Sequence, residues 1–215
     1  MLLNYLRTGE LVLPQDKSAR RELQLELEFY QFENVVAVVM EPFEGSVLQL
    51  TDYHRKMLLQ WFRQSCEPAA TTVDCQLLYR MSRDGPNAET FYASCGGRSQ
   101  TFLIARSTSG YLFGGYTSGP WTRQVVMDPK SFIFTLTNPY SIAPTKFPVA
   151  VHIGALSAAG PTWGAGNDLV FGHTLTSASC NHLQGDSTGR GRVLFTGSNA
   201  MQVVEVEVWA CRAQQ

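Results

Sequence analysis

Thiol and imidazole side chains are the groups with the widest chemical range in this 215-residue sequence. A thiol nucleophile needs a base within reach, and a metal ion needs several ligands at short spacing. The nearest approach to ligand spacing is Cys180-Asn181-His182, with His173 upstream, and it has no Cys-x-x-Cys partner. We therefore expect no metal site.

Catalysis by a thiol is the main enzymatic alternative that the sequence leaves open. Cys95 or Cys180 would be the nucleophile of a thiol-dependent hydrolase or redox enzyme, but no base can be identified for either. Asp84 and Glu207 are candidates for paired carboxylates, although nothing in the sequence brings them together. Asp84 lies in a Ser-Arg-Asp-Gly turn, where a carboxylate ordinarily accepts hydrogen bonds from the backbone. The sequence also has no Gly-x-Ser-x-Gly nucleophile motif, so we expect that the chain is not an enzyme.

Two glycine clusters raise the question of a phosphate-binding loop. They are Gly114-Gly115 and the run Gly185-x-x-x-Gly189-x-Gly191. A P-loop ends in Gly-Lys-Ser/Thr, so that the lysine and the hydroxyl reach phosphate and Mg²⁺, and neither cluster has that ending. We therefore expect no cofactor, and we expect Gly114 and Gly115 to have positive φ or to lie in close contact with a neighbouring strand.

Partner-binding candidates are drawn from tryptophans and loop arginines. Trp121, Trp163 and Trp209 are each either core aromatics or part of an interface, and burial is the favoured interpretation. Because Trp121 follows a proline and a turn, it is the first choice for an exposed anchor. Arg190 and Arg192 are the charged candidates, with solvated loop charges as the favoured interpretation.

Composition excludes several classes of partner. Hydrophobic residues make up 44% and charged residues 16%, which is typical of a soluble globular protein. The formal net charge of −1 gives no basic field for nucleic acid or anionic lipid.

We find no apolar run long enough to span a membrane and no secretory signal. Five scattered cysteines do not resemble a disulfide framework, so we expect a reducing compartment and a cytoplasmic protein. The cysteines are Cys66, Cys75, Cys95, Cys180 and Cys211.

Short apolar runs separated by Gly, Pro, Asn and Ser clusters dominate the sequence after residue 76. They lie at residues 77–79, 101–104, 111–113, 131–136, 149–153, 168–171 and 203–209. This spacing predicts an α+β, mainly β protein: a two-sheet antiparallel β-sandwich with flanking helices. An apolar stripe predicts a helix over residues 51–64 with Thr51 as its N-cap, packed on a sheet. One further helix is expected near residues 88–93.

The last strand alternates regularly after its first pair of valines. This alternation places Glu205 and Glu207 on a solvent face, and Val204, Val206 and Val208 on the core face. We therefore expect a strand that is buried on one side.

The N-terminal segment has two features of its own. A helix of three to four turns is predicted from Asp16 or Ser18, with Leu23, Leu27 and Tyr30 on its apolar face. The apolar run at residues 35–39 then reads as a linker or leading strand.

Several sequence blocks resemble the TLDc family over roughly residues 46–210. The most specific is Phe-Gly-Gly-Tyr-Thr-Ser-Gly-Pro-Trp at residues 113–121, preceded by Leu-Leu-Tyr-Arg at 77–80 and followed by Glu-Val-Glu-Val-Trp at 205–209. The positions that match the family's motifs are Arg80, Asp84, Gly114, Gly115, Tyr116, Trp121, Gly164, Asp168, Gly197, Glu205 and Glu207. The resemblance implies a TLDc fold and a role like that of the oxidation-resistance proteins. It also implies a protein partner, with vacuolar proton-pumping ATPase subunits as the candidate.

The segment before this region is similar to the C-terminal third of BTB domains of the potassium-channel-tetramerisation kind. The similarity rests on Leu-Asn-Tyr-Leu-Arg-Thr-Gly-Glu-Leu at residues 3–11 and on the helix that follows. We therefore expect a partial BTB domain at 1–35, a linker or leading strand at 36–45, and a TLDc domain at 46–211. This resemblance implies homo-oligomerisation, and a scaffold that displays several TLDc copies is a third alternative.

Overall fold

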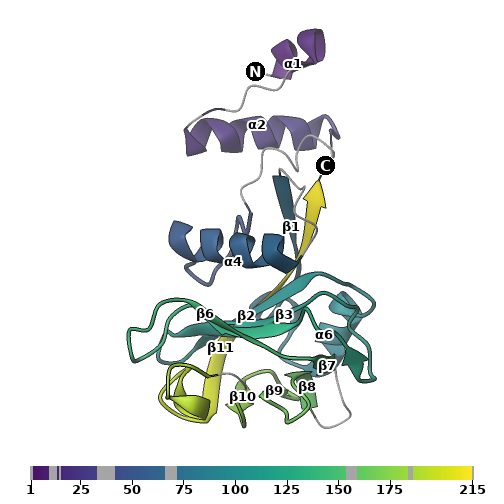
Figure 1. Ribbon diagram of the computed structural model, residues 1–215. Coiled ribbons are helices and arrows are strands. Elements are labelled where there is room, and N and C mark those ends of the chain that lie inside the picture. Colours follow the sequence, from purple (N-terminus) through teal and green to yellow (C-terminus); the bar gives the residue numbers. More distant parts are fainter. Residues whose placement is uncertain are drawn as a thin grey trace.

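Two antiparallel sheets, one above the other, form the body of the molecule (Figure 1). The computed structural model of the chain describes residues 2–9, 14, 16–32, 42–65, 72–153, 159–183 and 186–214. The first sheet contains β1 (Thr72–Arg80), β2 (Thr101–Ser107), β3 (Leu112–Thr117), β5 (Phe132–Thr135) and β6 (Thr145–Pro148). The second contains β4 (Val126–Met127), β7 (Val151–Ile153), β8 (Ala159–Trp163), β9 (Leu169–Gly172) and β10 (Ser177–Cys180). The sandwich predicted from the sequence is confirmed.

A single long strand, β11 (Ala200–Gln214), belongs to both sheets. Its first residues pair with β10, and the remainder lies between β1 and β2. The strand order is β4-β7-β8-β9-β10-β11-β2-β3-β5-β6, with β1 attached to β11. In Figure 1 the yellow β11 runs upward from the lower sheet past the upper one.

Helix α4 (Asp52–Ser65) covers the outer face of the first sheet, as the apolar stripe predicted. The Thr51 hydroxyl accepts a hydrogen bond from the backbone N–H of His54 at 3.2 Å, which satisfies one of the free donors at the start of the helix. Trp61 lies 5.6 Å from Phe134 between ring centroids, and Phe62 lies 6.2 Å from Tyr116. These aromatic contacts form a core on the α4 side of the sheet.

A second core fills the space between the two sheets. The single helical turn α5 (Met81–Asp84) and the helix α6 (Ala88–Cys95) cover one end of this core. A one-turn 3₁₀-helix, η1 (Gly191–Val193), lies between β10 and β11 in the chain. The Asn87 side chain caps α6 by accepting from the N–H of Thr90 at 2.8 Å. The α6 prediction is therefore confirmed, and α5 was not predicted. Its single turn is too short to give a periodic signal.

Helices α1 (Leu2–Thr8) and α2 (Lys17–Phe29) form a small cluster of their own, in which Leu2, Leu23 and Leu27 are buried. The Asp16 carboxylate accepts from the N–H of Ala19, so the expected helix start is confirmed. Tyr30 was expected on the apolar face, but it follows the helix and is 59% exposed. The run at residues 35–39 lies outside the described residues.

Gly114 and Gly115 are required by close packing, not by positive φ. A Cβ atom on Gly114 would meet the carbonyl oxygen of Leu103 on the adjacent strand. A Cβ atom on Gly115 would enter the indole ring of Trp163 on the opposite sheet. The predicted close strand contact is therefore confirmed, and it extends to the facing sheet.

One pair of cysteines departs from the expectation drawn from their scattered spacing. Cys75 on β1 and Cys211 on β11 form a disulfide across a register pair whose Cα atoms are 4.3 Å apart. The two residues are 136 positions apart in the sequence, so spacing alone could not reveal the pairing. Cys95 and Cys180 are free and buried.

Candidate functional site

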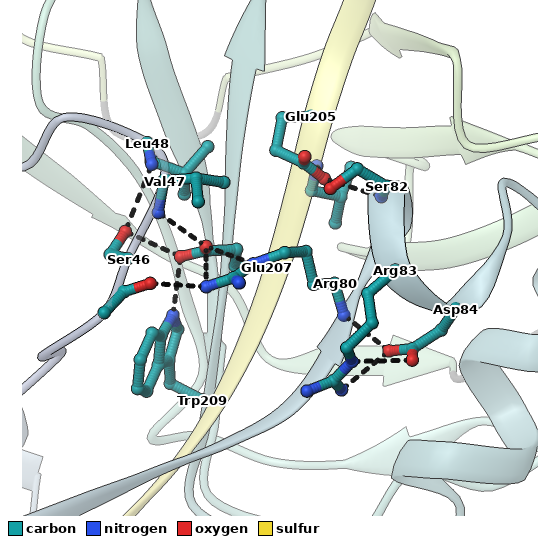
Figure 2. Close-up of polar contacts among 12 residues, drawn as sticks. Ser46, Val47, Leu48, Arg80, Ser82, Arg83, Asp84, Glu205, Glu207 and Trp209 are labelled. Carbon is teal, nitrogen blue, oxygen red and sulfur yellow. Dashed lines mark hydrogen bonds and ion pairs between the residues drawn. The ribbon is translucent and has the colours of Figure 1, made fainter.

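Glu207 lies at the centre of a buried polar network formed by motif residues (Figure 2). Its carboxylate accepts four hydrogen bonds, three from residues more than 120 positions away in the sequence and one from Trp209 on the same strand. The donors are the Ser46 hydroxyl at 2.6 Å, the Val47 N–H at 2.9 Å, the Arg80 Nε at 2.9 Å and the Trp209 indole Nε1 at 3.0 Å. The network therefore ties the segment before α4 to the β1–β11 strand pair.

Arg80 is the second centre of this network. Its guanidinium forms an ion pair with Glu207, with Nη2 2.9 Å from Oε1, and also donates from Nη2 to the carbonyl oxygen of Gly45 at 2.6 Å. Its backbone N–H donates to the Asp84 carboxylate at 2.8 Å. Asp84 in turn pairs with Arg83 at 2.7 Å. The two carboxylates that we considered as a catalytic pair are thus bound by the same arginine residue, one through its side chain and one through its backbone.

The electrostatics of Asp84 follow from these contacts. The hydrogen bond from Arg83 is the largest effect and lowers the pKa of Asp84, and the N–H of Arg80 acts in the same direction. Asp84 therefore stays ionised and accepts hydrogen bonds from the turn, as expected for a carboxylate in this position.

The expectation that Glu205 and Glu207 face solvent is wrong. Their exposed fractions are 5% and 0%, and Glu205 accepts from the N–H groups of Ser82 and Val206. The alternation reflects two covered faces, because β11 lies between the second sheet on one side and α5 with residues 42–50 on the other. Val204 was expected in the core but is 44% exposed, since the register shifts between Val203 and Glu205.

A second polar cluster surrounds Asp128, which is 3% exposed. Its carboxylate accepts from the N–H and hydroxyl of Ser118, the N–H of Gly119 and the hydroxyl of Ser131, at 2.6 to 2.9 Å. Burial would raise the pKa of Asp128, but the hydrogen bonds from Ser118, Ser131 and Gly119 together lower it. Sequence reasoning did not identify this cluster, because Asp128 lies between Met127 and Pro129 and its donors Ser118 and Gly119 are 10 and 9 positions away.

Ser131, His152 and Asp128 have the residue types of a catalytic triad but not its arrangement. His152 Nδ1 lies 3.3 Å from the Ser131 hydroxyl and 3.5 Å from the Asp128 carboxylate. Its Nε2 lies 3.2 Å from the carbonyl oxygen of Pro120 and is therefore engaged with the backbone. Both Ser131 and His152 are buried, and burial lowers the pKa of His152. The cluster joins the β3–β4 turn to β7, and the described residues leave Ser131 only 1% exposed.

Neither of the two free thiols among the described residues has the environment of an activated nucleophile. Burial raises the pKa of Cys95 above its ordinary range and raises that of Cys180 to about 12. The Cys180 Sγ contacts the carbonyl oxygen of His182 at 3.5 Å, not its imidazole ring. A nucleophilic thiol requires the opposite shift, toward a lower pKa.

Trp121 is fully buried, so its choice as an exposed anchor is wrong. Its indole N–H donates to the Thr101 hydroxyl at 2.7 Å, and its ring makes edge contacts with Phe91, His152 and Trp163. The turn that precedes Trp121 directs its side chain into the core between the sheets. The preceding proline indicated the turn but not the direction of the side chain. Trp163 and Trp209 are buried, as favoured from the sequence.

The remaining motif positions serve the fold through burial, backbone conformation or close contact. They are Tyr116, Gly164, Asp168 and Gly197. Tyr116 is buried in the α4-side core, and Gly164 and Gly197 have φ of 85° and 84°. A Cβ atom on Gly164 would meet the Asp168 carboxylate, whose buried Oδ1 has no hydrogen-bond partner among the described residues. Burial raises the pKa of Asp168.

Arg190 and Arg192 are exposed on the loop that includes η1. The Arg190 guanidinium lies 4.5 Å from the centre of the Tyr140 ring. Asp186 holds the base of the loop by accepting from the N–H groups of Thr188 and Gly191 at 2.7 and 2.6 Å. These arginines are therefore presented on an ordered turn.

Within the described ranges, no three His, Cys, Asp or Glu side chains are grouped as metal ligands. The same part of the chain has no helix that is long and apolar enough to cross a membrane.

Comparison with protein families identifies most of the chain. Residues 46–212 match the model of the TLDc domain, which begins at Ser46 and includes both polar clusters. A comparison with curated proteins found no match.

Proposed function

Because the chain belongs to the TLDc domain family, we propose that it is a non-catalytic protein-binding module that acts in protection against oxidative damage. The observation that supports a non-catalytic role is the saturation of Glu207. Its carboxylate already accepts four hydrogen bonds inside the protein, and the one from Arg80 belongs to an ion pair. The carboxylate therefore has no free lone pair to offer a substrate. Motif residues that resemble catalytic groups are used to hold the fold.

The partner in this proposal is a protein, and subunits of the vacuolar proton-pumping ATPase are the first candidates by family resemblance. The surface that we assign to the contact is the η1 loop, where Arg190 and Arg192 are exposed within three residues of each other. Arginine on an ordered loop is well suited to pairing with carboxylates of a partner at low entropic cost.

The test is binding of the purified chain to individual peripheral subunits of the ATPase, measured by biolayer interferometry. The double charge reversal Arg190→Glu with Arg192→Glu should weaken binding at least about tenfold. Lys56→Glu with Arg63→Glu is the matched control, because both residues are exposed on α4 and the charge change is the same. An equal loss of affinity in both variants would show that the η1 loop is not the contact surface. If no subunit bound the chain, the ATPase would be excluded as the partner.

A homo-oligomeric scaffold is the second candidate, and exposed apolar side chains on α1 and α2 favour it. Leu3 is 82% exposed, Leu6 56%, Leu25 50% and Phe29 79%, on helices that resemble part of a BTB domain. Light scattering during size-exclusion chromatography should give a mass that is a multiple of 23.9 kDa. Removal of residues 1–32 should return the monomer mass of the shortened chain. A monomer before truncation would exclude self-association of this chain.

A further inference from the structure

An open pocket of about 400 Å³ lies at the loop end of the β2–β3 hairpin. Its volume is within the range of small-molecule sites, which is roughly 300–1,000 Å³. Leu48 and Leu112 are buried members of the α4-side core and give the pocket an apolar floor. The lining residues are Leu48, Gln49, His54, Arg106, Ser107, Thr108, Gly110, Leu112, Thr137 and Val204.

The pocket contains a cation that the fold does not use. Arg106 is half-buried and lines the pocket, and its guanidinium has no hydrogen bond or ion pair with any described residue. Glu205 is its register partner on β11, but the Glu205 carboxylate binds the N–H groups of Ser82 and Val206. A half-buried guanidinium without a protein partner leaves its planar donors free for a ligand, and a ligand with two oxygens can satisfy them.

Two further donors in the pocket also have no partner within the described chain. His54 Nδ1 accepts from the N–H of Thr51 at 3.3 Å, so the neutral ring carries its hydrogen on Nε2. Burial lowers the pKa of His54 and favours this neutral ring. The amide of Gln49 makes no hydrogen bond with a described side chain or backbone group. Gln49 is also held at φ 60°, a conformation that L-residues adopt only where the surrounding structure imposes it.

The charge balance of the lining decides the class of ligand. Its residues include one permanent cation and no carboxylate. Thr108 and Thr137 also line the pocket, and the buried Leu48 and Leu112 suit a short hydrocarbon or aromatic body.

We propose that this pocket binds a small organic acid, with a carboxylate or phosphate on Arg106 and its apolar part against Leu48 and Leu112. Gln49 and the Nε2–H of His54 supply the remaining donors to the anionic oxygens. This site is independent of the protein-binding role assigned to the η1 loop.

The test uses benzoate and phenyl phosphate as probes, with benzyl alcohol as the neutral probe of similar shape. Each is titrated into the ¹⁵N-labelled chain to about 10 mM while amide signals are recorded by NMR. Both anions should shift the Thr108 and Gly110 signals saturably, whereas benzyl alcohol should not. Arg106→Gln should weaken binding at least about tenfold. Arg63→Gln, which removes the same charge from an exposed position on α4, should leave it unchanged.

A second variant separates binding from folding. Gln49→Gly removes the amide and relieves the positive φ, so it should weaken benzoate binding severalfold without lowering the melting temperature. The proposal is overturned if neither anion gives a saturable shift, if benzyl alcohol binds as well as benzoate, or if folded Arg106→Gln retains the wild-type affinity.

Discussion

At the scale of single residues, the Arg80–Glu207 pair combines high burial with many partners. Removal of one partner from a buried ion pair leaves an uncompensated charge, which typically costs about 3–5 kcal/mol. Arg83–Asp84 is a chemically similar pair nearby, but the Arg83 side chain is 49% exposed. The two pairs therefore allow a matched comparison of buried and exposed charge.

We predict that Glu207→Gln lowers the free energy of unfolding by about 3 kcal/mol or more, because all four of its partners are donors and the new amide nitrogen cannot accept from them. Urea denaturation followed by tryptophan fluorescence measures this change. Arg83→Gln is the control and should cost no more than about 1 kcal/mol. Similar losses in the two variants would show that burial of the Glu207 pair is not what makes it important.

Gly115 tests the contact between the sheets. Gly115→Val should destabilise the protein by on the order of 1–3 kcal/mol, because its side chain must displace the Trp163 ring. Gly110→Ala is the comparison, since its Cβ would meet no atom within 4 Å and would test backbone strain alone at φ 83°. Thermal unfolding should show the larger decrease for Gly115→Val. An unchanged melting temperature for that variant would mean that the sheets can separate at this point.

Asp128 gives a pH-dependent prediction. Its native pKa is below the unfolded value of about 4, so its stabilisation is complete above pH 4 and is lost as the pH falls through the native pKa. The difference in melting temperature between wild type and Asp128→Asn should therefore be largest near pH 7 and should narrow below pH 4.

Asp168 provides the opposite control for this experiment. Burial raises its pKa, so its contribution is present below pH 4 and is lost as the pH rises toward the native pKa. The melting temperature of wild type relative to that of Asp168→Asn should therefore rise as the pH is lowered. If both gaps moved in the same direction, the charge states inferred for these carboxylates would be wrong.

At the scale of elements, periodicity predicted those segments in which one face is buried. Residues 52–65 and 132–135 carry apolar side chains at helix and strand spacing, and both elements form as predicted. Strands β8 and β10, with the sequences Ala-Gly-Pro-Thr-Trp and Ser-Ala-Ser-Cys, were not predicted, because small and polar side chains give no alternation. Their strand conformation is imposed by pairing with β9, a tertiary effect.

The sequence could not reveal the polar site for the same reason. Glu207 meets Arg80 across 127 positions and Ser46 across 161, and no local pattern reports such contacts. Family motifs did select the correct residues, including Arg80, Asp84 and Glu207, but not their burial. A charged residue in an alternating strand ordinarily indicates a face that is exposed to solvent. Here the charged Glu207 is buried, and hydrogen-bond donors surround its carboxylate.

The disulfide joins the two strands that carry most of this network. In the chain-entropy model, a crosslink that closes a loop of more than 100 residues stabilises by about 4–5 kcal/mol. We predict that reductant lowers the unfolding midpoint of wild type and does not affect Cys75→Ser with Cys211→Ser. Denatured, unreduced wild type should contain two fewer reactive thiols than the reduced protein. A full count of five thiols without reductant would contradict the pairing.

At the scale of the whole molecule, two sheets and two cores depend on a single C-terminal strand. β11 pairs with β10 in one sheet and with β1 and β2 in the other, and it supplies Val206 and Val208 to the core between them. Within the described chain, β1 has no strand partner other than β11.

This arrangement has a consequence during synthesis. Translation proceeds from the N-terminus, so residues 1–199 leave the ribosome before the strand that completes both sheets. Until β11 emerges, Arg80 has no Glu207 to pair with and β1 has an open edge. Completion of both sheets therefore waits for residues 200–214, and unpaired strand edges stay exposed until these residues emerge. Transcripts that end before residue 200 should yield protein that is degraded, not a shorter working module.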